Sequence, residues 1–466
     1  MYITILFTIL CSLNEATFKS NDVHNHLGSR TPYRFRFNKN DTKIKYPNCK
    51  DAKIWMLVRH GTRLPSDTDV IGMNTTLKDL KFEILLYHQL GQGELSEKQL
   101  SSFEEWSPNV DIEHNKFLTT EGEEELLLLA QRMQKRFPGA IKHKYSNNSF
   151  LFKYTATQRA QESARHFANG LFTKKDTQDV VFAPAAKIEP VIRFYKHCDK
   201  WQKQIKKNPN TYREQKLFAV SKEMNKTMES VSKRLGFNSV LGLDTVNLMY
   251  KVCGFETSWY KHHESPWCYA FDSNDAQVNH AFIKTQHYDP ITLVINNTVT
   301  DHDLVVVLLN NFKHEKPCEY MKKIDFTKVS KIISETSFTE VVETNKDGPN
   351  ATFLFAHSGT ILKILSHIGL YKPEFPLKGD TLVKNRPWKS SFIDCFAANL
   401  AFVLFKCKDG EHVLALHQEH IIKLPMCEKE LCSLKYLMKH FHDSIYDCDY
   451  SDMCSLESNK STKDEL

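Results

Sequence analysis

Three short apolar runs recur along the chain, and each leads directly to residues that can carry a charge or a proton. The runs cover residues 54–58, 150–155 and 351–356. Each has the length of a buried strand and falls short of the ~20 residues that a membrane-spanning helix needs. Helical spacing follows the second and third runs, from Gln158 through Gly170 and from Ile361 to Leu370. Strands that alternate with helices predict an α/β sheet.

Two further segments show helical periodicity. Residues Glu123 to Phe137 form an amphipathic pattern that a Pro-Gly pair ends and that Thr119 or Thr120 can cap. From Trp201 to Tyr250, apolar residues recur at helical spacing without strand alternation, and core packing is their simplest role. Residues 66–116 are expected to be polar and irregular. A chain of 466 residues therefore predicts one large α/β domain with a sizeable helical insertion, or two domains.

The residues that follow the first apolar run form the most distinctive motif of the chain, Arg59-His60-Gly61-Thr62-Arg63-Leu64-Pro65. A neutral imidazole can attack phosphorus, and guanidinium groups are always charged and shaped to hold phosphate oxygens in pairs. For an isolated His-Arg pair, a structural histidine beside surface arginines is the commoner arrangement. The five fixed residue types of the pattern R-H-G-x-R-x-P reverse that preference and indicate a phosphate site.

The other two predicted strands also end at residues that suit a phosphate. Arg159 stands at the start of the helix that follows the second strand, and His357 directly follows the third strand. In an open α/β sheet, ligands bind beyond the carboxyl ends of the strands, where helix N-termini help to hold anions. Alone, either residue would more often be structural. With the opening motif present, we expect the three strand ends to converge on one site.

The pattern R-H-G-x-R-x-P resembles that of the histidine acid phosphatases, a branch of the histidine phosphatase superfamily. Two further landmarks of the family are similar to Leu118-Thr119-x-x-Gly122 and to the segment from Arg159 to Gly170. A phosphatase that works through a phosphohistidine intermediate is what this resemblance implies.

The resemblance also implies a role for each site residue. His60 is the expected nucleophile, and His357 is the expected second catalytic residue. The residues expected to bind the substrate phosphate are Arg59, Arg63 and Arg159. No metal and no other cofactor is implied.

Two segments, residues 193–200 and the stretch from Cys253 to Cys268, resemble the multiple inositol polyphosphate phosphatases within this family. This implies a histidine-phosphatase-like α/β domain flanked by helices, with an inserted, mainly α-helical cap domain. The expected boundaries are residues 45–195 and 345–430 for the discontinuous α/β domain and 196–344 for the cap. The implied partner is a small polyanionic substrate, an inositol polyphosphate such as phytate.

One position departs from the pattern of those phosphatases. They carry Ala-Glu-Thr after the distal histidine, and the glutamate protonates the departing alcohol. Here His357 is followed by Ser358-Gly359-Thr360, so that Gly359 occupies the glutamate position. Relatives with a His-Asp motif place the acid one residue earlier, where this chain has Ser358. The proton donor is therefore unknown, and a positioned general acid typically contributes ~10²- to 10⁴-fold to the rate.

Three functions stay open at this stage. The leading one is a phosphomonoester hydrolase that removes phosphate from inositol polyphosphates. The second function is a catalytically impaired pseudophosphatase that binds inositol polyphosphates, and the loss of the proton-donor glutamate at Gly359 favours it. In such a protein, Gly359→Glu is expected to restore or raise turnover. The third is a broad acid phosphatase that acts on simple phosphate esters or 2,3-bisphosphoglycerate.

Both ends of the chain carry address signals. Residues 1–20 contain an apolar stretch with the length of a signal-peptide core, which predicts a cleaved signal. The tail, residues 431–466, ends in the retrieval signal Lys463-Asp464-Glu465-Leu466. Together they predict a protein of the endoplasmic reticulum lumen that is partly secreted. The KDEL retrieval receptor is the expected partner, and no transmembrane segment is expected in the mature chain.

Cysteines and sequons are typical of the same compartment. Of the 12 cysteines, Cys11 lies in the predicted signal, and the odd number that remains leaves at least one unpaired thiol. Cys253 with Cys268 and Cys427 with Cys432 are candidates for local bridges. The sequons that could carry glycans are at Asn40, Asn74, Asn147, Asn225, Asn296 and Asn350.

The charge balance narrows the classes of partner. The net charge is only +6 in 466 residues, which does not indicate a nucleic-acid partner and is compatible with a small polyanion. No Cys-x2-Cys pair occurs in the sequence. A zinc site is therefore not expected.

Overall fold

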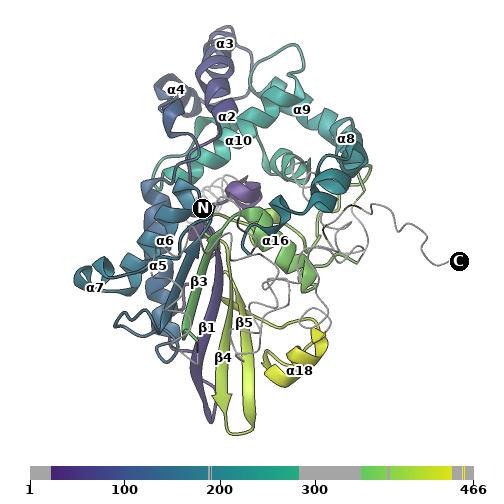
Figure 1. Ribbon diagram of the computed structural model, residues 1–466. Coiled ribbons are helices and arrows are strands. Elements are labelled where there is room, and N and C mark those ends of the chain that lie inside the picture. Colours follow the sequence, from purple (N-terminus) through teal and green to yellow (C-terminus); the bar gives the residue numbers. More distant parts are fainter. Residues whose placement is uncertain are drawn as a thin grey trace, which may run out of the picture.

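The computed structural model describes residues 23–186, 189, 191–282, 348–374, 378–442, 454 and 456. The predicted signal peptide, the sequon at Asn296 and the KDEL sequence lie outside these residues. In the described part, a sheet flanked by helices lies next to a second group of helices (Figure 1). The predicted combination of an α/β sheet with a helical unit is confirmed. The domain boundaries themselves stay a prediction.

A seven-stranded mixed sheet is the centre of the α/β part. Its strands are β1 (Cys49–Arg59), β2 (Phe150–Tyr154), β3 (Ala351–Ala356), β4 (Asn399–Cys407), β5 (Gly410–His417), β6 (His420–Ile422) and β7 (Leu431–Ser433). The strand order is β2-β3-β1-β4-β5-β6, and β7 pairs with β5. β1 and β2 run parallel to β3, whereas β4 runs antiparallel to β1 and β5. The three strands predicted from the apolar runs are confirmed as β1, β2 and β3.

The three parallel strands end at the same edge of the sheet. Arg59 at the end of β1 pairs with Ala356 at the end of β3, and β2 ends level with them. The next residues, His60 after β1 and His357 after β3, therefore emerge side by side. This edge faces the second group of helices (Figure 1).

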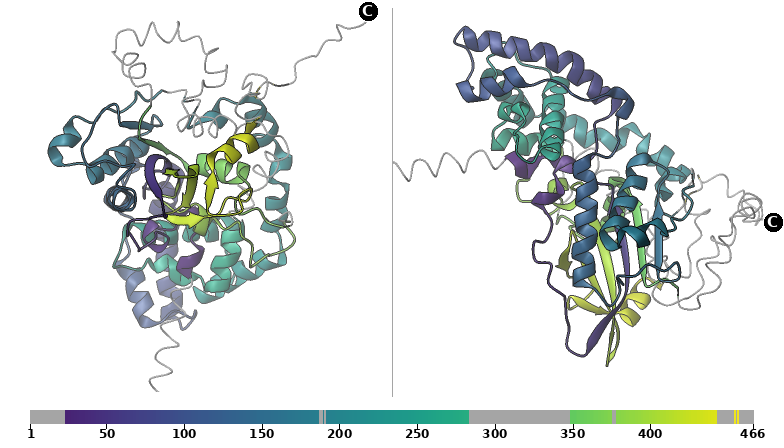
Figure 2. Two further views of the ribbon diagram at one scale, coloured as in Figure 1. Left: turned by 90° about the horizontal axis from the view of Figure 1, so that it is seen from below. Right: turned by 90° about the vertical axis from the view of Figure 1, so that its left-hand side faces the viewer.

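Helices cover the sheet on both sides and enclose its core. α5 (Thr120–Arg136) and α6 (Gln158–Leu171) lie against one side, and α16 (Ser358–His367) and α18 (Leu434–His440) lie against the other (Figure 2). Two further short helices are α7 (Lys174–Gln178), which is partly exposed, and α17 (Ser390–Ile393), which is mostly buried. The apolar residues of β1, β3 and β4 are almost completely buried between these layers, as a parallel centre requires.

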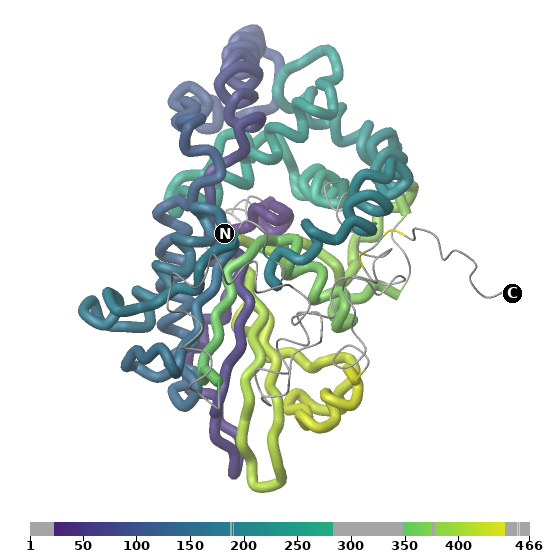
Figure 3. The backbone as a smooth tube through the Cα atoms, in the orientation of Figure 1, coloured from purple at the N-terminus to yellow at the C-terminus, as the bar shows by residue number. Residues whose placement is uncertain are grey.

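The second group of helices has a hydrophobic core of its own. Its members are α2 (Asp67–Gly72), α3 (Lys78–Gln89), α4 (Glu97–Glu105), α8 (Arg213–Ala219), α9 (Lys222–Arg234) and α10 (Leu243–Trp259). Met73 and Ile84 pack in one buried cluster with Val246 and Met249 of α10. Figure 3 shows α3 and α10, which are far apart in the sequence, in the same upper part of the molecule.

The expectation that residues 66–116 are polar and irregular is wrong, because this segment forms α2, α3 and α4. Each helix buries only a narrow apolar face against the rest of the group, and most of its exposed residues are polar. A capping box of Ser96 and Gln99 fixes the start of α4. Periodicity and capping residues therefore indicate these helices in the sequence, whereas their average hydrophobicity does not.

Disulfides connect distant parts of the chain. The two predicted local bridges, Cys253–Cys268 and Cys427–Cys432, are confirmed. The structure also contains two long-range bridges, Cys49–Cys407 and Cys198–Cys454. Cys395 is buried and free, in line with the predicted unpaired thiol. In the described residues, no helix is long and apolar enough to cross a membrane.

Candidate active site

His60 sits directly after the carboxyl end of β1, and hydrogen bonds fix its backbone and its ring. Its backbone N–H donates to the carbonyl of Ala356, which ties the loop to β3 (3.1 Å). Ring Nδ1 lies 2.9 Å from the carbonyl oxygen of Gly61, which can only accept, so the Nδ1 proton stays in place. Nε2 then carries the lone pair. Burial and, after it, the nearby Arg59 and Arg159 hold the pKa of His60 well below its usual value, so the ring is neutral.

The loop after β1 is held by very close packing against the start of α5. A Cβ atom at Gly61 would lie 2.5 Å from the carbonyl oxygen of Gly122, and a Cβ at Gly122 would lie 2.2 Å from the carbonyl oxygen of Thr62. Thr119 caps α5, since its Oγ1 accepts from the N–H of Gly122 (3.2 Å). Both glycines are therefore required by space, which explains the Gly of R-H-G and the Gly of Leu-Thr-x-x-Gly.

A buried carboxyl group on α5 accepts hydrogen bonds from the same loop. Glu125 of α5 accepts from the N–H of Thr62 (2.7 Å), from the Thr62 hydroxyl (3.0 Å) and from the N–H of Tyr33 (3.0 Å). Burial raises the pKa of Glu125 to about 7 despite these bonds. The backbone next to His60 is thus fixed by hydrogen bonds to a buried carboxyl group.

Arg159 and His357 meet at the same sheet edge. His357 is the N-cap residue of α16, and Arg159 lies in the first turn of α6. His357 Nδ1 lies 3.5 Å from Arg159 Nη2, and its Nε2 lies 2.9 Å from Thr155 Oγ1. The ring centroids of His357 and His60 are 5.6 Å apart. Burial, followed by Arg159, lowers the pKa of His357 to about 2, so this ring is neutral too.

The guanidinium groups of the motif surround the two histidines. Arg59 Nη1 donates to the carbonyl oxygens of Ser29 (2.8 Å) and Asp394 (2.7 Å). Burial and the neighbouring arginines lower the pKa of Arg63 to about 9 and that of Arg159 to about 10. Both groups stay protonated at acidic and neutral pH. Their mutual repulsion is relieved by an anion, and a phosphate dianion suits this geometry.

Two further arginines belong to the cluster, and sequence analysis missed them. Arg30 lies over the ring of Phe255 at 5.1 Å, and Arg63 lies over the same ring at 5.4 Å. Arg193 contributes to the lowered pKa of both Arg159 and His357. Buried guanidinium nitrogens without a hydrogen-bond partner occur in Arg30, Arg59, Arg159 and Arg193. Such atoms are costly unless an anion binds there. Arg30 stands in no motif, whereas Arg193 opens a segment whose resemblance could have suggested a role.

The position of the missing proton donor is crowded. A Cβ atom at Gly359 would lie 3.2 Å from the hydroxyl oxygen of Tyr195. Tyr195 thus lies in close contact with the point at which a glutamate side chain would begin. A side chain at position 359 requires Tyr195 to shift by a few tenths of an ångström, and the expectation that Gly359→Glu restores or raises turnover stays a prediction of the pseudophosphatase alternative.

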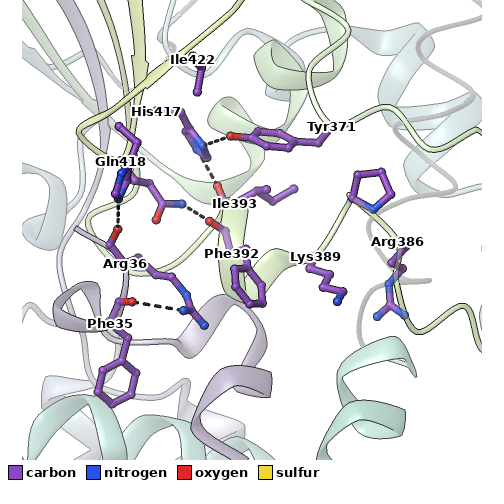
Figure 4. A pocket seen from close by; sticks show the side chains of 12 residues that line it. Phe35, Arg36, Tyr371, Arg386, Lys389, Phe392, Ile393, His417, Gln418 and Ile422 are labelled. Atoms are coloured by element: carbon purple, nitrogen blue, oxygen red, sulfur yellow. Dashed lines mark hydrogen bonds between the residues drawn. The ribbon is translucent and has the colours of Figure 1, made fainter. Parts of the chain in front are cut away.

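A cavity of about 550 Å³ is separate from this site. Figure 4 shows Arg36, Lys389 and Arg386 on its wall, and His417 Nδ1 is 2.7 Å from the hydroxyl of Tyr371. None of the arginines and histidines around His60 lines this cavity. It therefore does not contribute to the chemistry at the sheet edge.

One group of side chains in the described residues has the spacing of a metal site. Cys407, Asp409 and His412 lie close enough together to share an ion. The sulfur of Cys407 is already bonded to Cys49, and the group sits at the turn between β4 and β5. This turn is at the end of the sheet away from His60, since Cys407 pairs with the start of β1. The candidate active site contains no part of it.

The chain is similar to known phosphatases in sequence. A family model described as histidine phosphatase superfamily (branch 2) matches residues 53–424. Multiple inositol polyphosphate phosphatase 1 of Drosophila melanogaster is 26% identical over 425 residues, which cover 88% of this chain and 82% of that protein. The protein of the same name from Homo sapiens is 23% identical over 465 residues, covering 94% and 87%.

Solved structures share the fold. The phytase from D. castellii superposes with a TM-score of 0.66 at 14% identity, over 93% of this chain and 87% of that chain. The multiple inositol polyphosphate phosphatase of Bifidobacterium longum, in complex with inositol hexasulfate, gives a TM-score of 0.60 at 12% identity, over 91% and 98%. The motif, the geometry of the sheet edge and the family match agree. The chain therefore belongs to branch 2 of the histidine phosphatase superfamily and is a phosphatase enzyme.

Proposed function

We propose that this phosphatase removes phosphate groups from inositol polyphosphates through a phosphohistidine intermediate on His60. The observation that carries the proposal is the neutral ring of His60, whose Nδ1 is fixed by the Gly61 carbonyl within a cluster of arginines. Nε2 is thereby free to attack phosphorus. Family resemblance gives the same role to this histidine.

The first chemical step joins His60 Nε2 to phosphorus and breaks the bond from phosphorus to the ester oxygen. As the ring gains positive charge, the Gly61 carbonyl stabilises its Nδ1–H. Arg59, Arg63 and Arg159 hold the oxygens of the phosphoryl group during transfer. In the second step, water attacks the phosphohistidine, inorganic phosphate leaves, and His60 is regenerated.

The width of the arginine cluster supports a substrate with several phosphates. Arg30 and Arg193 extend the cluster beyond the three arginines expected from the motif. One phosphoryl group does not need five guanidinium groups. The named relatives are phosphatases of inositol polyphosphates and phytases, which supports the same substrate class.

Phosphate release from inositol hexakisphosphate and from p-nitrophenyl phosphate tests the proposal, with His60→Ala as the blank. Turnover of both substrates, abolished by His60→Ala, is the expected result. Turnover of the aryl ester alone would favour the broad acid phosphatase. Binding of inositol hexakisphosphate without any turnover would indicate the impaired pseudophosphatase.

We also propose that the protein works in an oxidising compartment of the secretory pathway, the lumen of the endoplasmic reticulum. The four disulfides in the described part support this, because such bridges are rare in reducing compartments. Asn40, Asn74, Asn147 and Asn225 are exposed, whereas Asn350 is half-buried and donates to a backbone carbonyl. Endoglycosidase digestion and fractionation of cells that produce the full chain test both parts of the proposal. A cytosolic, unglycosylated product would contradict it.

A further inference from the structure

A buried carboxyl group lies beside the position where the family's proton donor is missing. Ser358 Oγ donates to Asp394 Oδ2 at 2.5 Å. The other carboxylate oxygen of Asp394 lies 3.6 Å from Arg59 Nη1. The side chain of Asp394 is only 1% exposed, whereas Ser358 is partly exposed. A proton held by Asp394 therefore has a direct hydrogen-bond path to the hydroxyl of the partly exposed Ser358.

The pair formed by Ser358 and Asp394 is connected to both histidines of the site through their sequence neighbours. Ser358 directly follows His357, and Arg59, which Asp394 contacts, directly precedes His60. The serine also occupies the position where relatives with a His-Asp motif carry their acid. We propose that Asp394, acting through the Ser358 hydroxyl, donates the proton to the leaving alcohol. This inference rests on the proposed phosphatase function and supplies its missing step.

The proton transfer balances in both chemical steps. When Asp394 is protonated, its carboxyl group donates to Ser358 Oγ, and the Ser358 hydroxyl proton is directed to the ester oxygen. As the bond from phosphorus to that oxygen breaks, the alcohol takes the serine proton and Ser358 takes the carboxyl proton, which leaves a carboxylate on Asp394. In the second step, the attacking water gives its proton back along the same path. Asp394 is protonated again when phosphate departs.

Tyr195 is the competing donor, because its hydroxyl lies closest to the position of the missing glutamate. Its chemistry is less suitable. Burial raises the pKa of Tyr195 above its usual value, which makes it a weaker acid than in water. A tyrosine donor would also stay protonated across the acidic and neutral range. A carboxyl donor loses its proton as the pH rises in that range, and this difference can be measured.

The experiment compares phosphate esters whose leaving groups differ in basicity, from p-nitrophenyl phosphate through phenyl phosphate to glycerol phosphate and inositol hexakisphosphate. The variants are Asp394→Asn, Ser358→Ala and Tyr195→Phe in the full chain, with His60→Ala as the blank. Asp394→Asn and Ser358→Ala should lower kcat for the alkyl esters by ~10²- to 10⁴-fold, the usual contribution of a general acid. The p-nitrophenyl ester needs little protonation, so its kcat should fall far less. Tyr195→Phe should keep the leaving-group dependence of the unmodified protein.

The pH profile separates proton donation from a structural role. In the unmodified protein, kcat for alkyl esters should fall as Asp394 loses its proton with rising pH, and this limb should be absent in Asp394→Asn. Thermal unfolding shows whether each variant is folded. The double variant S358D/D394N places a carboxyl group at the His-Asp position and should regain alkyl turnover over Asp394→Asn alone.

Five results would overturn the inference. Equal losses for aryl and alkyl esters in Asp394→Asn would mean that Asp394 only orients Arg59. Unchanged alkyl turnover in that variant, or a selective alkyl loss in Tyr195→Phe, would assign the proton elsewhere. Aryl turnover without any alkyl turnover in the unmodified protein would also overturn it, while the phosphatase assignment stands. If the unmodified protein is active on none of the esters, the proposed function is contradicted together with this inference.

Discussion

The close packing beneath the nucleophile gives a quantitative prediction for Gly61→Ala. The new methyl carbon would lie 2.5 Å from the carbonyl oxygen of Gly122 and 2.6 Å from Leu126 Cδ2. Ordinary contact begins at 3.4 Å, so the loop that carries His60 has to move by about 0.9 Å. A misplacement of about 1 Å at a reacting group can lower the rate about 10²-fold. Forcing an extra methyl into a packed site also costs roughly 1–3 kcal/mol of stability.

Gly242→Ala is the matched control, because no atom lies within 4 Å of a Cβ at that position and its φ of −66° suits any residue. We expect kcat for p-nitrophenyl phosphate to fall about 100-fold in Gly61→Ala and to stay near the unmodified value in Gly242→Ala. Thermal unfolding of both variants separates a displaced loop from a protein that does not fold. If folded Gly61→Ala keeps the kcat of Gly242→Ala, this packing does not position His60.

Three further predictions concern groups around the site. Gly359→Glu alone should not raise inositol phosphate turnover and should cost roughly 1–3 kcal/mol of unfolding free energy, because its Cβ meets the hydroxyl of Tyr195; a gain in turnover would contradict this. Burial raises the pKa of Glu125 from 4.5 to about 7, so its contribution to stability is present below pH 4.5 and is lost as the pH rises through 7. Across this window, the unfolding free energy of the unmodified protein, measured with urea, should decline by roughly 3 kcal/mol, and Glu125→Gln should remove this decline. Equal pH slopes for the two proteins would refute the prediction. Arg30→Ala and Arg193→Ala should lower kcat/KM for inositol hexakisphosphate more than for p-nitrophenyl phosphate, because only the inositol ester has further phosphates that these arginines can bind. Equal losses on both substrates would contradict binding of those further phosphates.

The sheet edge could be predicted from the sequence because its signals are local. Each parallel strand is a short apolar run, and the reactive residue directly follows it, as with His60 and His357. Parallel neighbours end at one edge, so three separate signals point to one place. The bridge between Cys427 and Cys432 is predictable for the same reason, as its partners are close in sequence.

Features made by tertiary contact could not be predicted in this way. Arg30 and Asp394 carry no motif, and each joins the site through residues far away in the chain. The same holds for the bridge from Cys49 to Cys407, whose partners are 358 residues apart. The helices between residues 66 and 116 were missed because their buried face is narrow and packs against α10 rather than against their sequence neighbours.

The central claim is that His60 becomes phosphorylated, and rapid-quench labelling tests it most directly. The protein is mixed with a radiolabelled phosphate ester, quenched in alkali, in which phosphohistidine is stable, and digested. The account predicts label on the peptide that contains His60, formed before phosphate is released and absent from His60→Ala. Label on another residue, or turnover by His60→Ala at the unmodified rate, would contradict it.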